Sequence, residues 1–145
     1  MIRKVNKKNR FGFTMIEVMA VLIILGLLGT LVVTKVAQNV EKARVAVTKS
    51  NLKILHTAVS QFRMDAGRLP TDDEGLYVLI EQPSDVVDYP EGGYLEMPDI
   101  ELDGWKHEFI YELLPGTNSG FQIRSCGPDG DPDTDDDLLS TAINK

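Results

Sequence analysis

The segment from Phe13 to Val33 constrains this chain most, because its 21 residues carry a single ionisable side chain, that of Glu17. A helix rises 1.5 Å per residue, so a helix of this length would extend roughly 31 Å, close to the hydrocarbon thickness of a bilayer. A cleaved secretory signal has a shorter apolar stretch followed by a small-x-small cleavage site, and no such site follows Val33. We therefore expect residues 13–33 to form a membrane-spanning helix that stays on the mature protein.

Charge is distributed unevenly on the two sides of this segment. The residues before it carry no acid and five basic side chains: Arg3, Lys4, Lys7, Lys8 and Arg10. Residues 65–145 carry 20 acidic side chains and four basic ones. The positive-inside rule then places the N-terminus in the cytoplasm and the acidic part on the other side of the membrane. Because acidic surfaces repel phosphate backbones, the composition argues against nucleic-acid binding.

Glu17 is unusual, because a carboxylate inside an apolar helix costs about 2.5–3.5 kcal/mol on insertion scales. One interpretation is that Glu17, only four residues into the segment, lies at the level of the lipid headgroups, where the cost is small. The other is that Glu17 has a charged partner.

Residues 7–17, Lys-Lys-Asn-Arg-Phe-Gly-Phe-Thr-Met-Ile-Glu, resemble the class III signal of type IV pilins and type II secretion pseudopilins. In that family a basic leader ends in Gly, the next residue is usually Phe, and a Glu is fifth in the mature chain. The resemblance implies that a prepilin peptidase removes residues 1–12 by cutting between Gly12 and Phe13, and that it N-methylates Phe13. Glu17 of one subunit would then pair with the amine of its neighbour during assembly.

The residues after Val33 predict that the helix continues to about residue 66. No proline occurs between Phe13 and Leu69, and Gly67 and Pro70 would end the helix. Apolar residues recur at spacings near three and four, namely Val36, Val40, Ala43, Val47, Leu55, Val59 and Phe62.

The second half of the chain predicts a small sheet. Residues 108–112 and 121–124 are strand-like, and the turn residues 115–120 between them predict an antiparallel hairpin. Residues 92–95 are expected to form a short edge strand, and we expect five side chains to pack in a core against the helix: Trp105, Phe109, Tyr111, Phe121 and Ile123.

Residues 69–76, Leu-Pro-Thr-Asp-Asp-Glu-Gly-Leu, are similar to the Pro-Thr-x-Glu-Gln-Gly-Leu segment that follows the long helix in major pseudopilins of type II secretion. The resemblance implies a type IV pilin-like α+β fold, with a long N-terminal helix packed on a small antiparallel β-sheet and a C-terminal calcium loop. Residues 1–12 would be the leader, 13–33 the transmembrane and assembly helix, and 34–145 the periplasmic globular domain, with the acidic calcium loop at 125–138.

The most acidic part of the chain has six aspartates within residues 129–137. Carboxylates this close repel one another unless water or a cation compensates, and hard oxygen ligands favour Ca²⁺ over zinc or copper. The loop is not an EF-hand, because Thr134 and Ser140 stand where that motif needs Gly and Glu. The alternative interpretation is a solvated acidic tail.

Residues 125–130 and 135–138 are similar to the Ser-x-Gly-x-Asp-Gly and Asp-x-Asp-Ile segments of major pseudopilins, whose C-terminal loop binds calcium. Asp133 lies outside the matched positions. The resemblance implies a set of ligands made of the backbone carbonyl of Cys126 and the side chains of Asp129, Asp131, Asp135, Asp136 and Asp137.

No catalytic motif is present in the sequence. His56 and His107 have no Ser and acid placed with them as nucleophile and orienting group, and Cys126 has no second cysteine to pair with. We therefore expect a structural protein and not an enzyme.

The resemblance implies a subunit of the periplasmic pseudopilus, a homopolymer that supports export of folded proteins. It also implies a single-pass inner-membrane location. The expected partners are the prepilin peptidase, the minor pseudopilins and the inner-membrane assembly platform of the secretion system. The alternatives are a surface type IV pilin and a membrane-tethered periplasmic enzyme or calcium-binding module.

Overall fold

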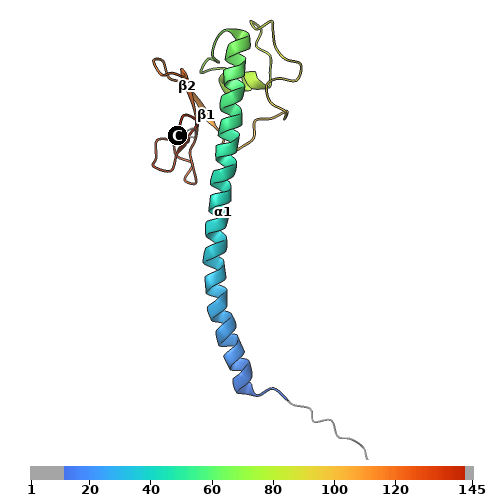
Figure 1. Cartoon of the computed structure of the whole chain (residues 1–145), viewed down its shortest axis with the longest axis vertical. Coiled ribbons are helices and arrows are strands. Elements are labelled where there is room, and N and C mark those ends of the chain that lie inside the picture. Colours follow the sequence, from blue (N-terminus) through green and yellow to red (C-terminus); the bar gives the residue numbers. More distant parts are fainter. Residues whose placement is uncertain (1–11, 143–145) are drawn as a thin grey trace, which may run out of the picture. The chain divides into compact units, whose positions relative to one another are not determined.

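The computed structural model describes the backbone of residues 12–142, and the side chains of these residues except 30–34. Its elements are the helix α1 (Met15–Ala66), the 3₁₀-helix η1 (Gly75–Leu79) and the strands β1 (Ile110–Leu113), β2 (Phe121–Ser125) and β3 (Leu138–Leu139). Figure 1 labels α1, β1 and β2. The chain falls into two compact units, residues 1–40 and 41–145. These elements confirm the predicted α+β fold, with one long N-terminal helix and a small antiparallel sheet.

Local interactions fix both ends of α1. At its start the backbone N–H of Glu17 donates to Thr14 Oγ1 (3.3 Å), and the backbone N–H of Thr14 donates to Glu17 Oε2 (3.1 Å). This reciprocal pair is a capping box, which satisfies two backbone donors that a helix start leaves free. At its end Gly67 has a φ of 72° and donates its N–H to the carbonyl of Arg63 (3.0 Å). The predicted end of the helix at Gly67 is confirmed.

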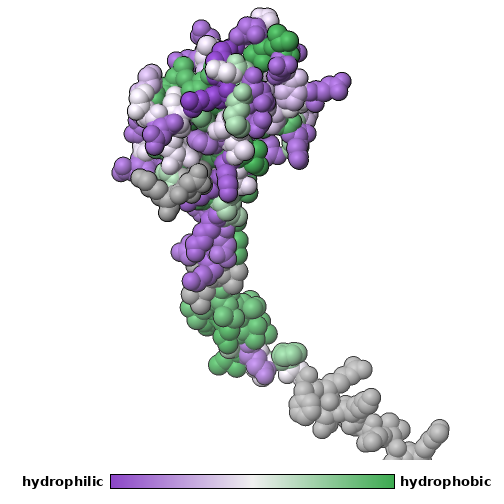
Figure 2. All heavy atoms as spheres, turned by 45° about the horizontal axis from the view of Figure 1, so that its top comes forward, coloured by the Kyte–Doolittle hydropathy of each residue, from purple (hydrophilic) through white to green (hydrophobic). Residues whose placement is uncertain are grey.

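In the first unit, the described apolar side chains of α1 are largely exposed. Met15 is 86% exposed and Leu22 is 63% exposed, and Figure 2 shows apolar residues gathered along this part of the helix. Among the described residues, no helix combines the length and the apolarity needed to cross a membrane. A membrane-spanning helix over residues 13–33 therefore stays a prediction.

The hydrophobic core lies in the second unit. Leu52, Val59 and Phe62 of α1 are fully buried and pack with Phe121 and Ile123 of β2. The upstream part of the predicted apolar stripe is different, because Val36, Val40 and Val47 are about half exposed: 54%, 47% and 50%. The residues of this stripe are therefore buried in the core only from Leu55 onward, and exposed apolar side chains remain upstream.

The sheet has the order β1-β2-β3, with both pairs antiparallel. Leu113 pairs with Phe121 across the predicted hairpin, which is thereby confirmed. Ser125 pairs with Leu138 in β3, a two-residue strand that the sequence did not predict. Because β3 returns to the end of β2, the acidic residues 126–137 form a closed loop between two paired strands.

Two predictions about the second unit are wrong. Residues 92–95 form no strand. Instead, the N–H of Tyr94 donates to the carbonyl of Leu79 (2.8 Å) within an irregular segment. Trp105 lies outside the core cluster, half-buried, and its indole N–H donates to Glu41 Oε1 (3.1 Å). A Trp with a polar partner is satisfied at the edge of a core.

Candidate functional sites: the acidic loop and the N-terminal segment

The acidic loop begins with a tight turn directly after β2. The N–H of Gly130 donates to the carbonyl of Cys126 (3.3 Å). Gly127 has a φ of 63°, and a Cβ at this position would lie 2.6 Å from Asp136 Oδ2 and 2.7 Å from the carbonyl oxygen of Asp136. Only glycine accepts both the positive φ and this close approach. The predicted carbonyl ligand of Cys126 therefore lies in a turn against which the far end of the loop packs.

Four oxygens of the acidic loop lie around the hydroxyl of Thr134. Its Oγ1 lies 2.7 Å from Asp136 Oδ1, 3.2 Å from the carbonyl oxygen of Asp131, and 3.5 Å from both Asp129 Oδ1 and Asp137 Oδ1. A threonine hydroxyl has one proton and therefore donates to one of these four acceptors at a time. The hydrogen bond from Thr134 is the main cause that lowers the pKa of Asp136. The hydroxyl proton of Thr134 therefore cannot satisfy all four of these oxygens at once.

The predicted ligands are placed unequally. The carboxylates of Asp129, Asp136 and Asp137 converge on Thr134, whereas Asp131 contributes its backbone: its N–H donates to Asp129 Oδ1 (3.0 Å) and its carbonyl faces Thr134. Within the described loop no hydrogen bond joins Asp135, which is exposed, to this group. In the described part of the chain, no three side chains of His, Cys, Asp or Glu are grouped so that they could hold a metal ion. The ligand set as a whole stays a prediction.

Arg124 of β2 supplies a positive charge at the closed end of the loop. Its guanidinium donates to Asp137 Oδ2 (3.2 Å), to Glu112 Oε2 (3.1 Å) and to Asp133 Oδ1. These carboxylates, Asp133 first, raise the pKa of Arg124. The roles of Arg124 and Thr134 are not predicted from the sequence. Their only sequence signals are a basic residue inside a strand and a lone hydroxyl among aspartates.

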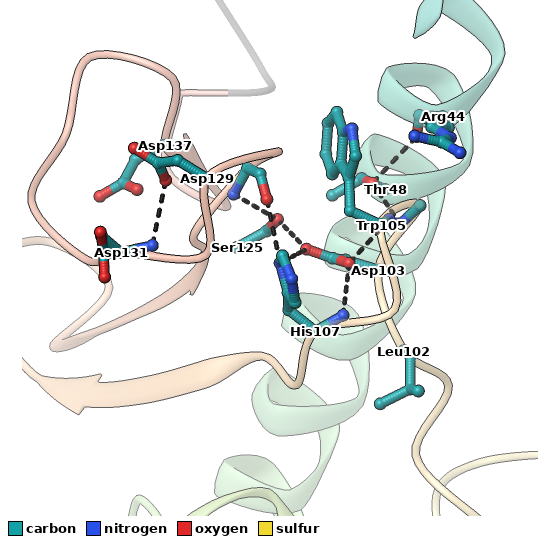
Figure 3. A network of polar contacts seen from close by, with 12 residues as sticks. Arg44, Thr48, Leu102, Asp103, Trp105, His107, Ser125, Asp129, Asp131 and Asp137 are labelled. Carbon is teal, nitrogen blue, oxygen red and sulfur yellow. Dashed lines mark hydrogen bonds and ion pairs between the residues drawn. The ribbon is translucent and has the colours of Figure 1, made fainter. Parts of the chain in front are cut away.

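A buried aspartate joins the start of the loop to the rest of the second unit (Figure 3). Asp103 has a fully buried side chain and accepts hydrogen bonds from the backbone N–H groups of Trp105 (2.9 Å) and His107 (2.8 Å), and from Ser125 Oγ (2.6 Å). The next residue, Gly104, donates its N–H to Thr48 Oγ1 of α1 (2.8 Å). The turn at 103–107 therefore ties the long helix to the residue after which the acidic loop begins.

Both histidines make contacts that support the fold. His107 Nδ1 donates to the carbonyl of Gly127 (3.0 Å), while the nearby Ser125 donates to Asp103 and not to His107. The ring of His56 stacks on Phe121 with centroids 4.7 Å apart, and its Nδ1 lies 3.3 Å from Ser140 Oγ. Burial lowers the pKa of His56. These contacts agree with the structural role predicted for both residues.

The N-terminal processing and assembly residues are only partly described. Gly12 and Phe13 are exposed, Phe13 by 88%, and they precede the start of α1. The basic leader residues 1–11 lie outside the described residues. Glu17 takes part in the capping box with Thr14, a local role that the Thr-x-x-Glu pattern indicates and that is not among the predictions above.

Comparisons with known proteins agree over almost the whole chain. Residues 35–141 match the family model described as type II secretion system (T2SS), protein G, and residues 7–33 match the prokaryotic N-terminal methylation motif. The chain is 39% identical to the type II secretion system core protein G of Klebsiella pneumoniae over 138 residues, which covers 92% of this chain and 96% of that protein. It is 31% identical to the core protein G of Escherichia coli K12, with 92% of each chain covered.

A solved structure is also similar. The crystal structure of the major pseudopilin from the type 2 secretion system of enterohaemorrhagic Escherichia coli matches with a TM-score of 0.61 and 30% identity. The match covers 75% of this chain and 94% of that one. The family model spans well over half of the chain, and the relatives match along nearly their whole length. The chain therefore belongs to the protein G family of the type II secretion system.

Proposed function

We propose that this chain is a structural subunit of the periplasmic pseudopilus of a type II secretion system and supports the export of folded proteins. The observation that carries the proposal is a methylation motif at residues 7–33 that extends into α1, where the described apolar side chains of the first unit are exposed in the single chain. Exposed apolar surface of this extent needs a partner, either lipid or other copies of the helix. The matched relatives are named as secretion system core proteins, which supports an assembly role and not an enzymatic one.

The same proposal assigns a location and partners. The subunit would sit in the inner membrane with its N-terminus in the cytoplasm and its second unit in the periplasm, until it joins a homopolymer. The basic leader and the apolar composition of residues 13–33 support this orientation. The prepilin peptidase would process the chain, and the minor pseudopilins and the inner-membrane assembly platform would act with it during assembly.

The first prediction concerns the N-terminus. The mature protein should begin at Phe13 with a methylated amine, because the Gly12–Phe13 bond lies in an exposed segment before α1. Mass spectrometry of membrane-extracted protein from a host with an active prepilin peptidase would test this. The matched control is the same host without the peptidase, where the chain should keep residues 1–12. Intact leader in both hosts would contradict the assignment.

We also propose that the loop of residues 126–137 binds Ca²⁺. The support is the group of oxygens around Thr134, which are hard ligands of the kind that Ca²⁺ prefers. Asp129, Asp136 and Asp137 would supply carboxylates and Asp131 its carbonyl. Asp135, the side chain of Asp131 and the carbonyl of Cys126 complete the set that the family resemblance implies. The bound cation would offset the mutual repulsion of the carboxylates.

The second prediction is that calcium stabilises the folded second unit. An ion that binds only the folded loop contributes RT ln(1 + [L]/Kd), or about 2.7 kcal/mol at a hundredfold excess over Kd. A chelator should therefore lower the Tm of the full chain in detergent, and Mg²⁺ should restore little of the loss because it prefers a small octahedral shell. Differential scanning calorimetry measures this shift.

Two variants make the calcium test specific. Asp129→Asn should abolish the difference in Tm between chelator and calcium, because it removes a carboxylate that faces Thr134. Asp99→Asn is the matched control, since Asp99 is exposed and lies outside the loop. Identical melting curves of the parent chain in chelator and in calcium would return the loop to the alternative of a solvated acidic segment.

A further inference from the structure

We propose that Arg124 is a built-in counter-cation of the acidic loop, and that it sets how strongly the folding of this loop depends on bound calcium. The inference rests on the proposed calcium site, and it assigns a positioning role to a residue on the central strand of the sheet. Nothing in the sequence pattern of the loop itself points to this residue.

The position of Arg124 is rigid and enclosed. It pairs with Ile110 of β1 on one side and with Leu139 of β3 on the other, so its backbone is held from both edges. Its side chain is only 10% exposed. A guanidinium anchored in this way can contact only the carboxylates that the fold brings to it, and two of these, Asp133 and Asp137, come from the acidic loop.

Asp137 shows how Arg124 acts on the loop. The side chain of Asp137 is 8% exposed, and its Oδ2 accepts from Arg124 Nη1 (3.2 Å) and from the backbone N–H of Asp133 (2.9 Å). Its other oxygen, Oδ1, lies 3.5 Å from Thr134 Oγ1, on the side of the gathered loop oxygens. Arg124 therefore holds one oxygen of Asp137 and leaves the other directed toward the proposed ion site.

The contact between Arg124 and Asp137 matters more for the stability of the ion-free loop than for that of the calcium-bound loop. Without calcium, Arg124 is the positive charge that compensates the buried Asp137, and its removal would leave that carboxylate without a cation. With calcium bound, the ion itself compensates Asp137, so the loss of Arg124 costs less. Arg124 thus stabilises the ion-free loop more than the ion-bound loop, and it reduces the stabilisation gained from calcium.

The test compares Tm in excess chelator and in excess CaCl₂ for the full chain in detergent, followed by the fluorescence of Trp105, the only tryptophan in the chain. Arg124→Gln should lower Tm more in chelator than in calcium, so that the calcium-induced rise in Tm is roughly doubled. Arg124→Lys keeps the charge but lacks the planar guanidinium that can contact several carboxylates. The calcium-induced rise in Tm of this variant should therefore lie between those of the parent and of Arg124→Gln.

Arg68→Gln is the matched control. Arg68 also holds two carboxylates, Glu74 at 2.8 Å and Asp85 at 2.9 Å, but neither belongs to the acidic loop. Its loss should lower Tm equally in chelator and in calcium. If Arg124→Gln also lowers Tm equally in chelator and in calcium, Arg124 is only structural and the inference is overturned. The proposal of a calcium site would still stand in that case if the Tm of the parent chain rises with calcium.

The remaining outcomes separate the two proposals. If the parent chain does not respond to calcium but Arg124→Gln does, Arg124 replaces the ion, which supports its counter-cation role and contradicts the calcium site of the native chain. If neither the parent nor any variant responds to calcium, both proposals are wrong.

An Arg124→Gln chain that folds only with calcium supports the inference. If it folds in neither condition, Asp133→Asn decides. This variant leaves Arg124 only Asp137 and Glu112 to compensate, so the calcium-induced rise in Tm should become smaller than in the parent chain. An unchanged rise in Tm would overturn the inference.

Discussion

Glu17→Ala should stop filament growth while cleavage between Gly12 and Phe13 and membrane insertion continue. Glu17 is the only ionisable side chain between Phe13 and Val33, so in this segment it is the one group that can pair with a methylated amine of a neighbouring subunit. A charge pair in an apolar environment loses much of its stabilisation when one partner is removed. Electron microscopy and shearing of filaments from a host with the secretion machinery should show polymer at background level, with processed monomer still in the membrane fraction.

The capping box gives Glu17 a second role, so two further variants are needed. Glu17→Gln keeps a side chain that can accept from Thr14 but removes the charge, and should fail to assemble if the pairing carries assembly. Thr14→Ala removes the cap, at a cost of about 1 kcal/mol, but keeps the charge, and should assemble. The opposite pattern, with Glu17→Gln forming filaments like the parent and Thr14→Ala failing, would show that Glu17 acts only by starting the helix.

The parts of the fold that the sequence predicts correctly are those set by local interactions. The long helix follows from a proline-free stretch and ends where Gly67 adopts its positive φ. The hairpin of β1 and β2 follows from two strand-like runs around a turn-rich segment. In both cases the residues that determine the structure are close together in the sequence.

Features that depend on distant contacts were missed. β3 has only two residues, and it exists because the chain returns to the end of β2, which no local pattern reveals. The spacing of the aromatic residues predicts Trp105 in the core, but its hydrogen-bond partner Glu41 lies 64 residues away. Val36, Val40 and Val47 have helical spacing and are nevertheless exposed, because spacing shows which residues share a face and not what covers that face.

The candidate site shows the same division. The six aspartates are evident from composition, and their chemistry indicates hard-cation binding. The residues that organise them are not evident. Thr134 matters because four oxygens surround its hydroxyl, and Arg124 matters because its side chain on β2 contacts Asp133 and Asp137 of the loop. Asp103 lies 22 residues before its hydrogen-bond partner Ser125. Loop composition therefore predicts the ligand type, whereas tertiary structure decides which oxygens converge.

Asp103→Ala should strongly destabilise the second unit. Asp103 accepts three hydrogen bonds with a side chain that is fully buried. Asp103→Ala would leave the N–H groups of Trp105 and His107 without this acceptor, and would free the buried Ser125 at the start of the acidic loop. Buried donors that lose their partner cost about 1–3 kcal/mol each, and two of these three hydrogen bonds are only partly buried, so the total loss should be about 3–5 kcal/mol.

Urea unfolding of the full chain in detergent, followed by circular dichroism and by Trp105 fluorescence, would measure this loss. It is a large part of the 5–15 kcal/mol that stabilises a typical domain. Asp103→Asn is the matched control, because its amide oxygen can accept from both N–H groups while its NH₂ donates to Ser125 Oγ. If Asp103 stabilises the fold through hydrogen bonds, this variant should lose much less free energy of unfolding than Asp103→Ala. An Asn variant as unstable as the Ala variant would show that the negative charge of Asp103 matters and not its acceptor geometry. An Ala variant as stable as the parent would show that the turn at 103–107 does not depend on this carboxylate, and the link from α1 to the acidic loop would then rest on the hydrogen bonds of Gly104 to Thr48, Trp105 to Glu41 and His107 to Gly127.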